Sequence, residues 1–419
     1  MLDIQLLETV VSDQAELFAN KPLGVSRSVD FDRYLASKHI VVISGVRRSG
    51  KSTLLAQFSK KLQPFHFITF DDERLLDFSV QDFQPLLLVL KKRSAAKVML
   101  LDEVQNVAGW ERFVRRLHDE GYKVFVTGSN AKLLSSELAT HLTGRYFKIE
   151  LFPFSFREFL AFRSLPSTPR TTAEQGAVAA AFDEYLAIGG FPEMVATKDS
   201  ETLKNIYEDV LYRDLITRFK IRDVKLFRQL AQYLLTNIAT EVSYLGLAKL
   251  LGAKSPVSIK RYVTFLTEAY FIGEVYKYDW SLKKQFVSNK KVYAIDTGMR
   301  SQVAFTFSED SGRLLENVVY LELRRRGQDV FYFKDTRECD FIIRDKNRIT
   351  EAIQVTRTLS AENEEREVAG LLQALERCRA KVGTILTYSQ RKTIKRDGKK
   401  IAVVPITDWL LKSFSTVSL

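Results

Sequence analysis

Short apolar runs alternate with helically spaced apolar residues over the first 150 positions of the chain. The apolar runs predict buried strands at 39–43, 98–103, 123–126 and 146–151. Helical spacing of apolar residues begins at 53, and it recurs over 109–120 and from 132 to about 140. Strands that alternate with helices in this way predict an α/β domain.

The pattern changes beyond residue 155. A polar, turn-rich loop at 164–172 precedes helical spacing from 173 to about 221, which Gly189-Gly190 interrupts. Three short helices and two β-like segments are then predicted at 227–238, 244–251, 256–270, 272–278 and 291–295. This order is typical of a winged helix-turn-helix at 225–302. Residues 303–419 again have the pattern of an α/β domain.

Composition narrows the class of protein. A hydrophobic content of 46% and a charged content of 27% are typical of a soluble globular protein. No apolar run is long enough for a membrane span, and the first residues lack a secretory signal, so a cytoplasmic location is expected. Two cysteines exclude a disulfide framework and most metal clusters. The net charge of +12 favours a polyanionic partner.

A glycine-bounded loop follows the first apolar run and leads into a helix. Its residues are Gly45-Val46-Arg47-Arg48-Ser49-Gly50-Lys51-Ser52-Thr53. Gly45 and Gly50 would let backbone amides wrap round a phosphate chain, with the positive end of the helix dipole behind them. Lys51 would reach the terminal phosphates and Ser52 would ligate Mg²⁺, so this P-loop predicts binding of ATP with Mg²⁺. The flanking strand and helix disfavour the alternative, a simple glycine turn.

Two further groups of polar residues end the next two predicted strands. Asp102 suits the magnesium-ligand role and Glu103 the role of general base for the attacking water. The following strand ends at Thr127-Gly128-Ser129-Asn130. Asn130 is the first candidate for a residue that senses the terminal phosphate, with Ser129 and Thr127 behind it. A turn or a helix cap is the alternative role of Asn130.

These motifs together resemble those of the prokaryotic AAA-type ATP-binding proteins with a C-terminal domain of unknown function. The resemblance rests on the P-loop and on the segments at 101–106, 127–131, 142–145 and 152–159. Gly189-Gly190-Phe191-Pro192-Glu193 is similar to the lid motif of that family. The resemblance implies a RecA-like AAA+ core at 1–155, a helical lid at 156–224, the winged helix at 225–302 and a nuclease-like fold at 303–419.

Arg145 lies just before the strand expected at 146–151. AAA+ ATPases carry there the arginine finger, which reaches into a neighbouring subunit and neutralises charge on the transferred phosphoryl group. An ion pair with a local acid is the alternative. If Arg145 is the finger, a lone subunit hydrolyses ATP slowly. Catalysis would then need a homo-oligomer, either a ring such as a hexamer or at least a dimer.

Cations gather in the winged-helix segment, where residues 243–300 hold ten Lys or Arg against four Asp or Glu. The helix from 256 would enter a DNA groove, with Lys260 and Arg261 on phosphates or base edges. The wing near Lys283 and Lys284 would touch the DNA backbone. The alternative is a protein-interaction module whose charges are solvated.

Residues 303–419 resemble the PD-(D/E)xK nuclease fold in the order of Glu316, Asp340 and Gln354. Thr356 stands at the position of the lysine, whose charge a hydroxyl cannot supply. We therefore expect a nuclease-like domain that has lost cleavage, with residual metal-dependent cutting as the alternative. The basic segment at 391–400 would hold a phosphate backbone or form a solvated hairpin tip.

The sequence therefore predicts an oligomeric AAA+ ATPase that couples ATP hydrolysis to remodelling of DNA or translocation on it. The order of core, lid and winged helix is similar to the bacterial motor that drives branch migration of Holliday junctions, so duplex or branched DNA is the specific hypothesis. Two alternatives remain. One is a nucleotide-dependent signalling or defence switch that acts through protein partners, and the other is an ATP-gated DNA nuclease.

Overall fold

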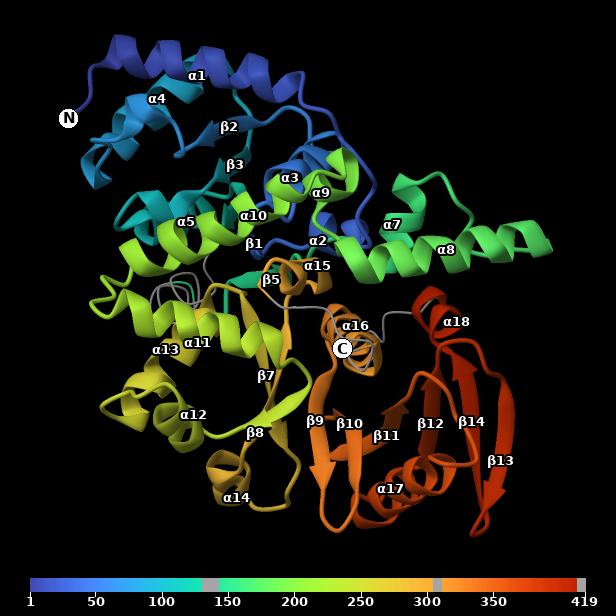
Figure 1. Ribbon diagram of the computed structural model, residues 1–419. Helices are drawn as coiled ribbons and strands as arrows, with labels where there is room; N and C mark the ends of the chain where they lie inside the picture. Colours follow the sequence, from blue (N-terminus) through green and yellow to red (C-terminus); the bar gives the residue numbers. More distant parts are fainter. Residues whose placement is uncertain (130–141, 143, 304–310, 413–419) are drawn as a thin grey trace. The chain divides into compact units, whose positions relative to one another are not determined.

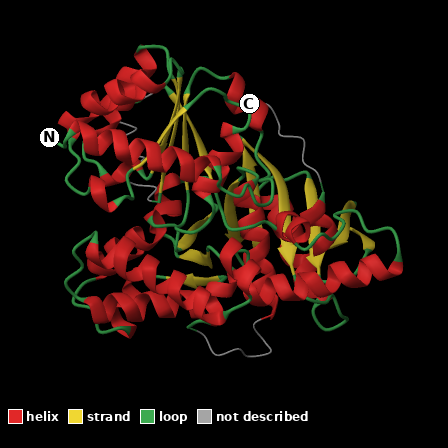
Figure 2. Cartoon of the chain, turned by 90° about the horizontal axis from the view of Figure 1, so that it is seen from above, coloured by secondary structure: helices red, strands yellow, loops and turns green. Residues whose placement is uncertain are grey.

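The computed structural model describes residues 1–129, 142, 144–303 and 311–412. The chain divides into two compact units. Unit 1 comprises residues 1–152 and 268–270, and unit 2 comprises 153–267 and 271–419. Helices lie beside the strands of the chain (Figure 2).

Unit 1 contains a five-stranded sheet in the order β2-β3-β4-β1-β5, with every neighbouring pair parallel. The strands are β1 Ile40–Ser44, β2 His66–Thr69, β3 Val98–Asp102, β4 Lys123–Gly128 and β5 Tyr146–Glu150. The chain segments that follow parallel strands emerge at one edge of the sheet, and this edge is where ligands bind in open α/β folds. The segments after β1, β3 and β4 therefore meet.

Helices cover both faces of this sheet (Figure 1). They are α1 Ile4–Ala19, α2 Phe31–Ala36, α3 Lys51–Ser59, α4 Phe83–Arg93 and α5 Trp110–Asp119, with short 3₁₀ helices at Glu73–Leu75, Val80–Asp82 and Val104–Asn106. Neighbouring residues of one strand point to opposite faces. Val42 accordingly packs in the core with residues of α1, α4 and α5, whereas Val41 packs in the core with residues of α3.

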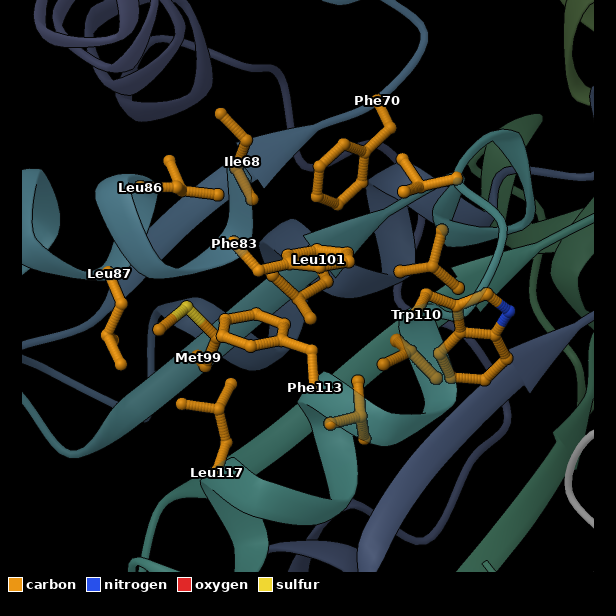
Figure 3. Close-up of a cluster of buried hydrophobic side chains, with 14 of the residues drawn as sticks. Ile68, Phe70, Phe83, Leu86, Leu87, Met99, Leu101, Trp110, Phe113 and Leu117 are labelled. Carbon is orange, nitrogen blue, oxygen red and sulfur yellow. The ribbon is translucent and has the colours of Figure 1, made fainter. Parts of the chain in front are cut away.

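Aromatic and aliphatic side chains fill the larger of these two cores (Figure 3). The rings of Phe83 on α4 and Phe113 on α5 stack with their centroids 4.3 Å apart. Met99 and Leu101 of β3 lie among them together with Ile68 of β2. This packing fixes the position of β3, whose last residue is Asp102.

The strands expected in the first 150 residues are confirmed, with small shifts of their ends. The one difference that bears on function is Glu103, which the apolar run at 98–103 placed inside a strand. β3 ends at Asp102, and Glu103 has a left-handed backbone with φ of 52°. The helix expected from 132 to about 140 lies outside the described residues.

Unit 2 is larger and contains both helices and strands. Its helices are α7 Phe156–Phe162, α8 Thr172–Ile188, α9 Pro192–Thr197, α10 Ser200–Glu208, the π-helix η4 Asp209–Thr217, α11 Val224–Thr236, α12 Tyr244–Leu250, α13 Pro256–Glu268, α14 Leu282–Val287, α15 Thr297–Ser301, α16 Ser311–Arg325, α17 Glu364–Arg377 and α18 Ile406–Leu411. Among the described helices of the whole chain, none has the length and apolar character needed to cross a membrane.

The strands of unit 2 form one nine-stranded mixed sheet in the order β13-β14-β12-β11-β10-β9-β7-β8-β6. They are β6 Thr240–Val242, β7 Ile272–Lys277, β8 Lys290–Ala294, β9 Asp329–Lys334, β10 Glu338–Asp345, β11 Arg348–Val355, β12 Val382–Thr387, β13 Lys392–Arg396 and β14 Lys399–Pro405. β7 pairs with β9, so strands on both sides of the boundary expected at 302/303 share one sheet. The division of this unit into lid, winged helix and C-terminal domain remains a prediction.

The glycine pair of the lid motif lies against a buried carboxylate of unit 2. Asp296 accepts a hydrogen bond from the Gly190 amide at 2.7 Å, and it caps α15 through the Gly298 amide at 2.9 Å. A Cβ atom on Gly189 would lie 1.9 Å from Asp296 Oδ1, and one on Gly190 would lie 2.3 Å from the Phe154 carbonyl oxygen. Only glycines fit here.

This close approach predicts that Gly190→Ala destabilises unit 2, because the added methyl group would collide with rigid backbone. We expect a loss of about 1–3 kcal/mol, the usual result of overpacking. Gly176→Ala in α8 is the matched control, since no atom lies within 4 Å of its Cβ position. It should stabilise the helix by about 0.5–1 kcal/mol. The midpoints of urea unfolding measure the stability of both variants. Equal midpoints for the two variants would contradict the close packing at Gly190.

Candidate functional site

The loop after β1 has the backbone geometry that a phosphate-binding loop needs. A Cβ atom on Gly45 would lie 2.1 Å from the Leu151 carbonyl oxygen, so only glycine allows the loop to start beside the end of β5. Gly50 has φ of 95° and stands at the N-cap of α3, where a side chain would be strained. The loop therefore turns sharply into a helix whose first amides face the loop interior.

A buried arginine that the sequence analysis missed supports the back of this loop. Arg27 donates from Nη1 to the Ser49 carbonyl oxygen at 2.8 Å and from Nη2 to the Phe152 carbonyl oxygen at 2.6 Å. Gln57 of α3 holds the segment before Arg27 through the carbonyl oxygens of Leu23 and Val25, each at 2.7 Å. Arg27 thus ties the P-loop to the residues after β5.

Lys51 lies inside the loop, although lysine is rarely buried. Only 4% of the residue is exposed, and its ammonium donates to the carbonyl oxygens of Gly45 at 3.3 Å and Val46 at 3.2 Å. Its Nζ atom is also 3.8 Å from Oε1 of Glu103. A charge at this position is held where phosphate oxygens would enter the loop.

The two acids after β3 meet the P-loop through β4. The Thr127 hydroxyl donates to Oδ1 of Asp102 and accepts from the Glu103 amide at 3.0 Å. Burial raises the pKa of Asp102, as does the charge of Glu103, while hydrogen bonds from Thr127 and Ser52 oppose the shift. The expected magnesium pair, Ser52 and Asp102, therefore lies close enough for the Ser52 hydroxyl to lower the pKa of Asp102.

Glu103 is positioned by its unusual backbone conformation. Its left-handed φ of 52° is uncommon for a residue with a side chain, and such residues concentrate at functional sites. One carboxylate oxygen accepts a hydrogen bond from the Gln105 amide group, and the other faces Lys51. The carboxylate of Glu103 is thus oriented toward the P-loop.

The structure places the remaining predicted residues of unit 1 as follows. Arg47 is half-buried and Arg48 is exposed in the loop, with φ of 62° at Arg48. Thr53 is half-buried in the first turn of α3, and Ser129 is buried after β4. Asn130 lies outside the described residues, so its role as a sensor stays a prediction.

Arg145 lies far from the P-loop of its own chain. It precedes β5, whereas the P-loop follows β1, and the two parallel strands pair from Ile40↔Tyr146 to Ser44↔Glu150. Arg145 is therefore at the opposite edge of the sheet. Its guanidinium contacts Asp119 at 2.6 Å on the surface, which is the local ion pair that the sequence left open.

The candidate DNA-binding residues lie on two separate helices of unit 2. Lys260 and Arg261 are exposed on α13. Lys283 and Lys284 are also exposed, but they lie on α14 and not on a bare hairpin tip. Three other cations of the same segment are buried and cannot contribute to a DNA-binding surface: Lys290, Lys291 and Arg300.

The residues that resemble a nuclease motif do come together in part. Glu316 and Asp340 both contact Lys291 at 3.1 Å, and the Asp340 amide donates to Oε1 of Gln354 at 3.3 Å. Thr356 turns its hydroxyl to the Thr358 carbonyl oxygen at 3.3 Å. Of the six cations at 391–400, Arg391, Lys392 and Arg396 are already paired with Asp408, Glu364 and Glu365.

Fold and site together define a P-loop protein with an AAA domain. The family described as "AAA domain" matches residues 37–160, and two families described as domains of unknown function, DUF8612 and DUF4143, match 179–310 and 311–409. The chain belongs to the family of "Uncharacterized protein MJ1544" of Methanocaldococcus jannaschii, with 36% identity over 98% of this chain and 96% of that protein. An uncharacterized protein of Haemophilus influenzae is 32% identical over 89% of this chain and 94% of its own.

Solved structures of AAA+ proteins are similar only in outline. The replication initiator DnaA bound to AMPPCP and single-stranded DNA aligns with 57% of this chain and 85% of its own at 13% identity and a TM-score of 0.27. The Aeropyrum pernix ORC1 protein in complex with DNA aligns with 71% and 90% at 11% identity and a TM-score of 0.29. Scores this low carry no argument about function. The AAA domain itself implies nucleotide binding.

The position of Arg27 predicts that Arg27→Met leaves the P-loop less firmly held in its conformation. The change removes two buried, charge-assisted hydrogen bonds, each worth about 1.5–3 kcal/mol. We expect a lower melting temperature and weaker binding of a fluorescent ATP analogue. Arg93→Met is the control, because Arg93 is an exposed arginine of the same unit that bonds only at the surface to Ser12. Analogue affinity equal in the two variants would argue against this role.

Proposed function

We propose that this chain is an Mg²⁺-dependent ATPase whose site is the carboxyl edge of the unit 1 sheet. One observation carries the proposal: two motifs about fifty residues apart converge, since Lys51 Nζ is 3.8 Å from Glu103 Oε1 and the Ser52 hydroxyl lies close enough to Asp102 to lower its pKa. Lysine, hydroxyl and paired acids are the groups that P-loop hydrolases use. In a merely structural glycine turn, these four side chains would have no reason to meet.

The residues present fit both ATP and magnesium. The Ser49 hydroxyl is buried without a hydrogen-bond partner among the described residues, and it lies within the loop that would surround the phosphates. Ser52 and Asp102 offer the hydroxyl and carboxylate oxygens that Mg²⁺ prefers, with substrate phosphates as further ligands. A bound Mg²⁺ would neutralise phosphate charge. The donors of the loop backbone and Lys51 would orient the triphosphate.

Glu103 is the candidate general base. Its carboxylate faces the P-loop. Gln105 holds Oε2, and Oε1, which lies 3.8 Å from Lys51 Nζ, would accept a proton from water. Thr127 holds the backbone of Glu103 and the carboxylate of Asp102 at once. The Thr127 hydroxyl therefore links Glu103, the proposed base, to Asp102, the proposed metal ligand, and it holds both beside the P-loop.

Arg145 is proposed to act in the site of a neighbouring subunit. From the opposite edge of its own sheet it cannot serve its own P-loop. A surface pair such as Arg145 with Asp119 contributes little to stability, so the arginine is readily released to another partner. The working enzyme is therefore a homo-oligomer, with a ring as one arrangement.

Mixed variants test this function. Lys51→Ala should lose nucleotide binding, and Glu103→Gln should bind ATP but not hydrolyse it. Arg145→Ala should lose about 10³-fold or more in turnover, as arginine fingers do. A mixture of Glu103→Gln and Arg145→Ala protein should regain activity, because each supplies what the other lacks. Binding of a fluorescent ATP analogue separates Lys51→Ala from Glu103→Gln, and phosphate release measures turnover of every variant and of the mixture.

Arg115→Ala is the matched control for the finger, since Arg115 is exposed and contacts the same Asp119 at 3.9 Å. Its turnover should equal that of the wild type. If the mixture stays inactive while each variant still assembles, Arg145 does not act between subunits. Unchanged hydrolysis by Lys51→Ala would place the activity elsewhere.

We further propose that unit 2 binds duplex or branched DNA through a winged helix formed by α11, α12, α13 and the strands β7 and β8. Lys260 and Arg261 support this proposal because both are exposed on one turn of α13. Lys249 and Lys254 are exposed before the same helix, and Lys283 and Lys284 would contact the backbone from α14. Coupling of this surface to ATP hydrolysis would let the oligomer remodel DNA, including four-way junctions.

The double variant Lys260→Ala/Arg261→Ala tests the DNA surface. Loss of two phosphate contacts should weaken binding and reduce the slope of log affinity against log salt by about 2. Arg222→Ala/Lys225→Ala removes the same charge from exposed positions before and on α11 and serves as control. Fluorescence anisotropy with duplex and four-way-junction DNA measures both. Equal losses in the two double variants would mean that only net charge matters.

One observation favours the alternative of a switch that acts through protein partners. Large apolar side chains are exposed on and beside α14, namely Trp280, Leu282, Phe286 and Val287. Exposed apolar side chains gathered in this way mark surfaces that bind proteins more often than surfaces that bind nucleic acids. ATP turnover that no DNA structure alters would favour this switch over the DNA motor.

A further inference from the structure

A buried ammonium lies among three carboxylates in unit 2. Lys291 Nζ is 3.1 Å from Glu316 Oε1, 2.7 Å from Glu338 Oε1 and 3.1 Å from Asp340 Oδ1. Only 2% of Lys291 is exposed. The lysine comes from β8, Glu316 comes from α16, and the other two acids come from the start of β10. Three separate elements therefore meet at one cation.

The positions of these acids are fixed by their surroundings. β10 shifts register against β9 between Cys339 and Ile342, and a bulge of this kind re-aims the side chain of Asp340. The second oxygen of Asp340 accepts a hydrogen bond from the Val355 amide at 2.9 Å. Tyr293 of β8 donates its hydroxyl to Glu316 at 2.7 Å. The carboxylates of Glu316 and Asp340 cannot move apart without breaking these bonds.

The helix that carries Glu316 is bound to the strand that carries Lys291. Asn317, which is fully buried, accepts from the Ala294 amide at 2.8 Å and donates to the Ala294 carbonyl oxygen at 3.0 Å. The Asn317 side chain therefore bonds to both backbone groups of Ala294, as the backbone of a neighbouring strand would. It places Glu316 and Lys291 face to face across the boundary between the two matched domains of unknown function.

The charges in the cluster depend on one another. Burial lowers the pKa of Lys291, but the charges of Glu316 and Asp340 outweigh it, so the net shift is upward and the ammonium stays charged. Burial and the charge of Asp340 raise the pKa of Glu316 to about 7, against the effect of Lys291. The acids would repel one another strongly without the ammonium between them.

A catalytic metal does not fit this arrangement, although Glu316 and Asp340 match the metal positions of the nuclease motif. The ammonium stands between the carboxylate oxygens that would have to coordinate the ion. Gln354 is also engaged, since its amide nitrogen donates to Glu367 at 2.7 Å. Nowhere in the described ranges are three carboxylate, imidazole or thiol side chains arranged to hold a metal ion.

We propose that Lys291 is a built-in cation that fills the Glu316–Glu338–Asp340 cluster, closes it to divalent metal, and turns a metal position into a structural joint between β8 and the C-terminal elements. One positive charge is supplied by the chain itself. Removal of that charge would leave three carboxylates able to close round a divalent ion, and carboxylate oxygens are ligands that ions such as Mn²⁺ bind. Lys291→Met would therefore create a metal site that the native chain lacks. This inference is independent of ATP hydrolysis.

Melting temperature and Mn²⁺ electron paramagnetic resonance of the full-length, nucleotide-free protein test the proposal. The wild type should bind no Mn²⁺ in the cluster and show no melting shift with Mn²⁺. Lys291→Met should melt lower by on the order of 10 °C, because the buried acids Glu316 and Asp340 lose their counter-ion. Glu338 is half-buried and would keep its contact with Lys334. Mn²⁺ at about a hundredfold above its dissociation constant should then raise the melting temperature of this variant by roughly 5 °C or more.

Two further variants serve as controls. Lys290→Met removes a neighbouring buried lysine that hydrogen-bonds to the carbonyl oxygens of Phe286 and Ser288 and lies over the rings of Tyr244 and Tyr276, so it should not create Mn²⁺ binding. Lys291→Met/Asp340→Asn should lose the Mn²⁺ response. If the methionine variant does not fold, the wild type and Lys291→Arg still decide the matter, because both must ignore Mn²⁺. Wild-type Mn²⁺ binding that Asp340→Asn abolishes, or a folded Lys291→Met protein that binds none, would overturn the proposal.

Discussion

The site in unit 1 depends on the parallel register of three strands, β1, β4 and β3. β4 lies between the strand that leads into the P-loop and the strand that ends in the acids. Ile43 pairs with Thr127, and Leu101 pairs with Val126, so the next residue of β3, Asp102, stands beside Thr127. A slip of one residue would turn Thr127 to the other face of the sheet and separate loop from acids.

The sequence could single out residues that the fold of unit 1 brings together, because the motifs that hold them are local. Each motif sits directly after a short apolar strand, and periodicity locates such strands reliably. Glu103 shows where local patterns fail, since nothing in Leu-Asp-Glu announces a left-handed residue. Arg27 shows the second kind of failure. It acts through carbonyl oxygens that are 22 and 125 residues away, and an isolated arginine in a polar segment gives no signal of that contact.

Unit 2 was harder to predict because its sheet joins distant segments. The helices near 227, 244 and 256 and the strands near 272 and 291 were located correctly, since each has its own period. The parallel pairing of β7 with β9 was missed, as it depends on contacts between residues 276–277 and 331–332. The same holds for Lys291, which entered the sequence analysis only as one of the ten cations of residues 243–300. Only the fold shows that it is 2% exposed among acids from other elements.

The shared sheet also has a practical consequence for dissecting this chain. A truncation between 310 and 311, where the two matched domains of unknown function meet, would separate Asn317 from Ala294 and β9 from β7. The C-terminal fragment would expose the backbone of β9 as a new sheet edge, which invites self-association. Neither fragment is then a faithful substitute for its part of the whole protein, and aggregation of either would say nothing about its native role.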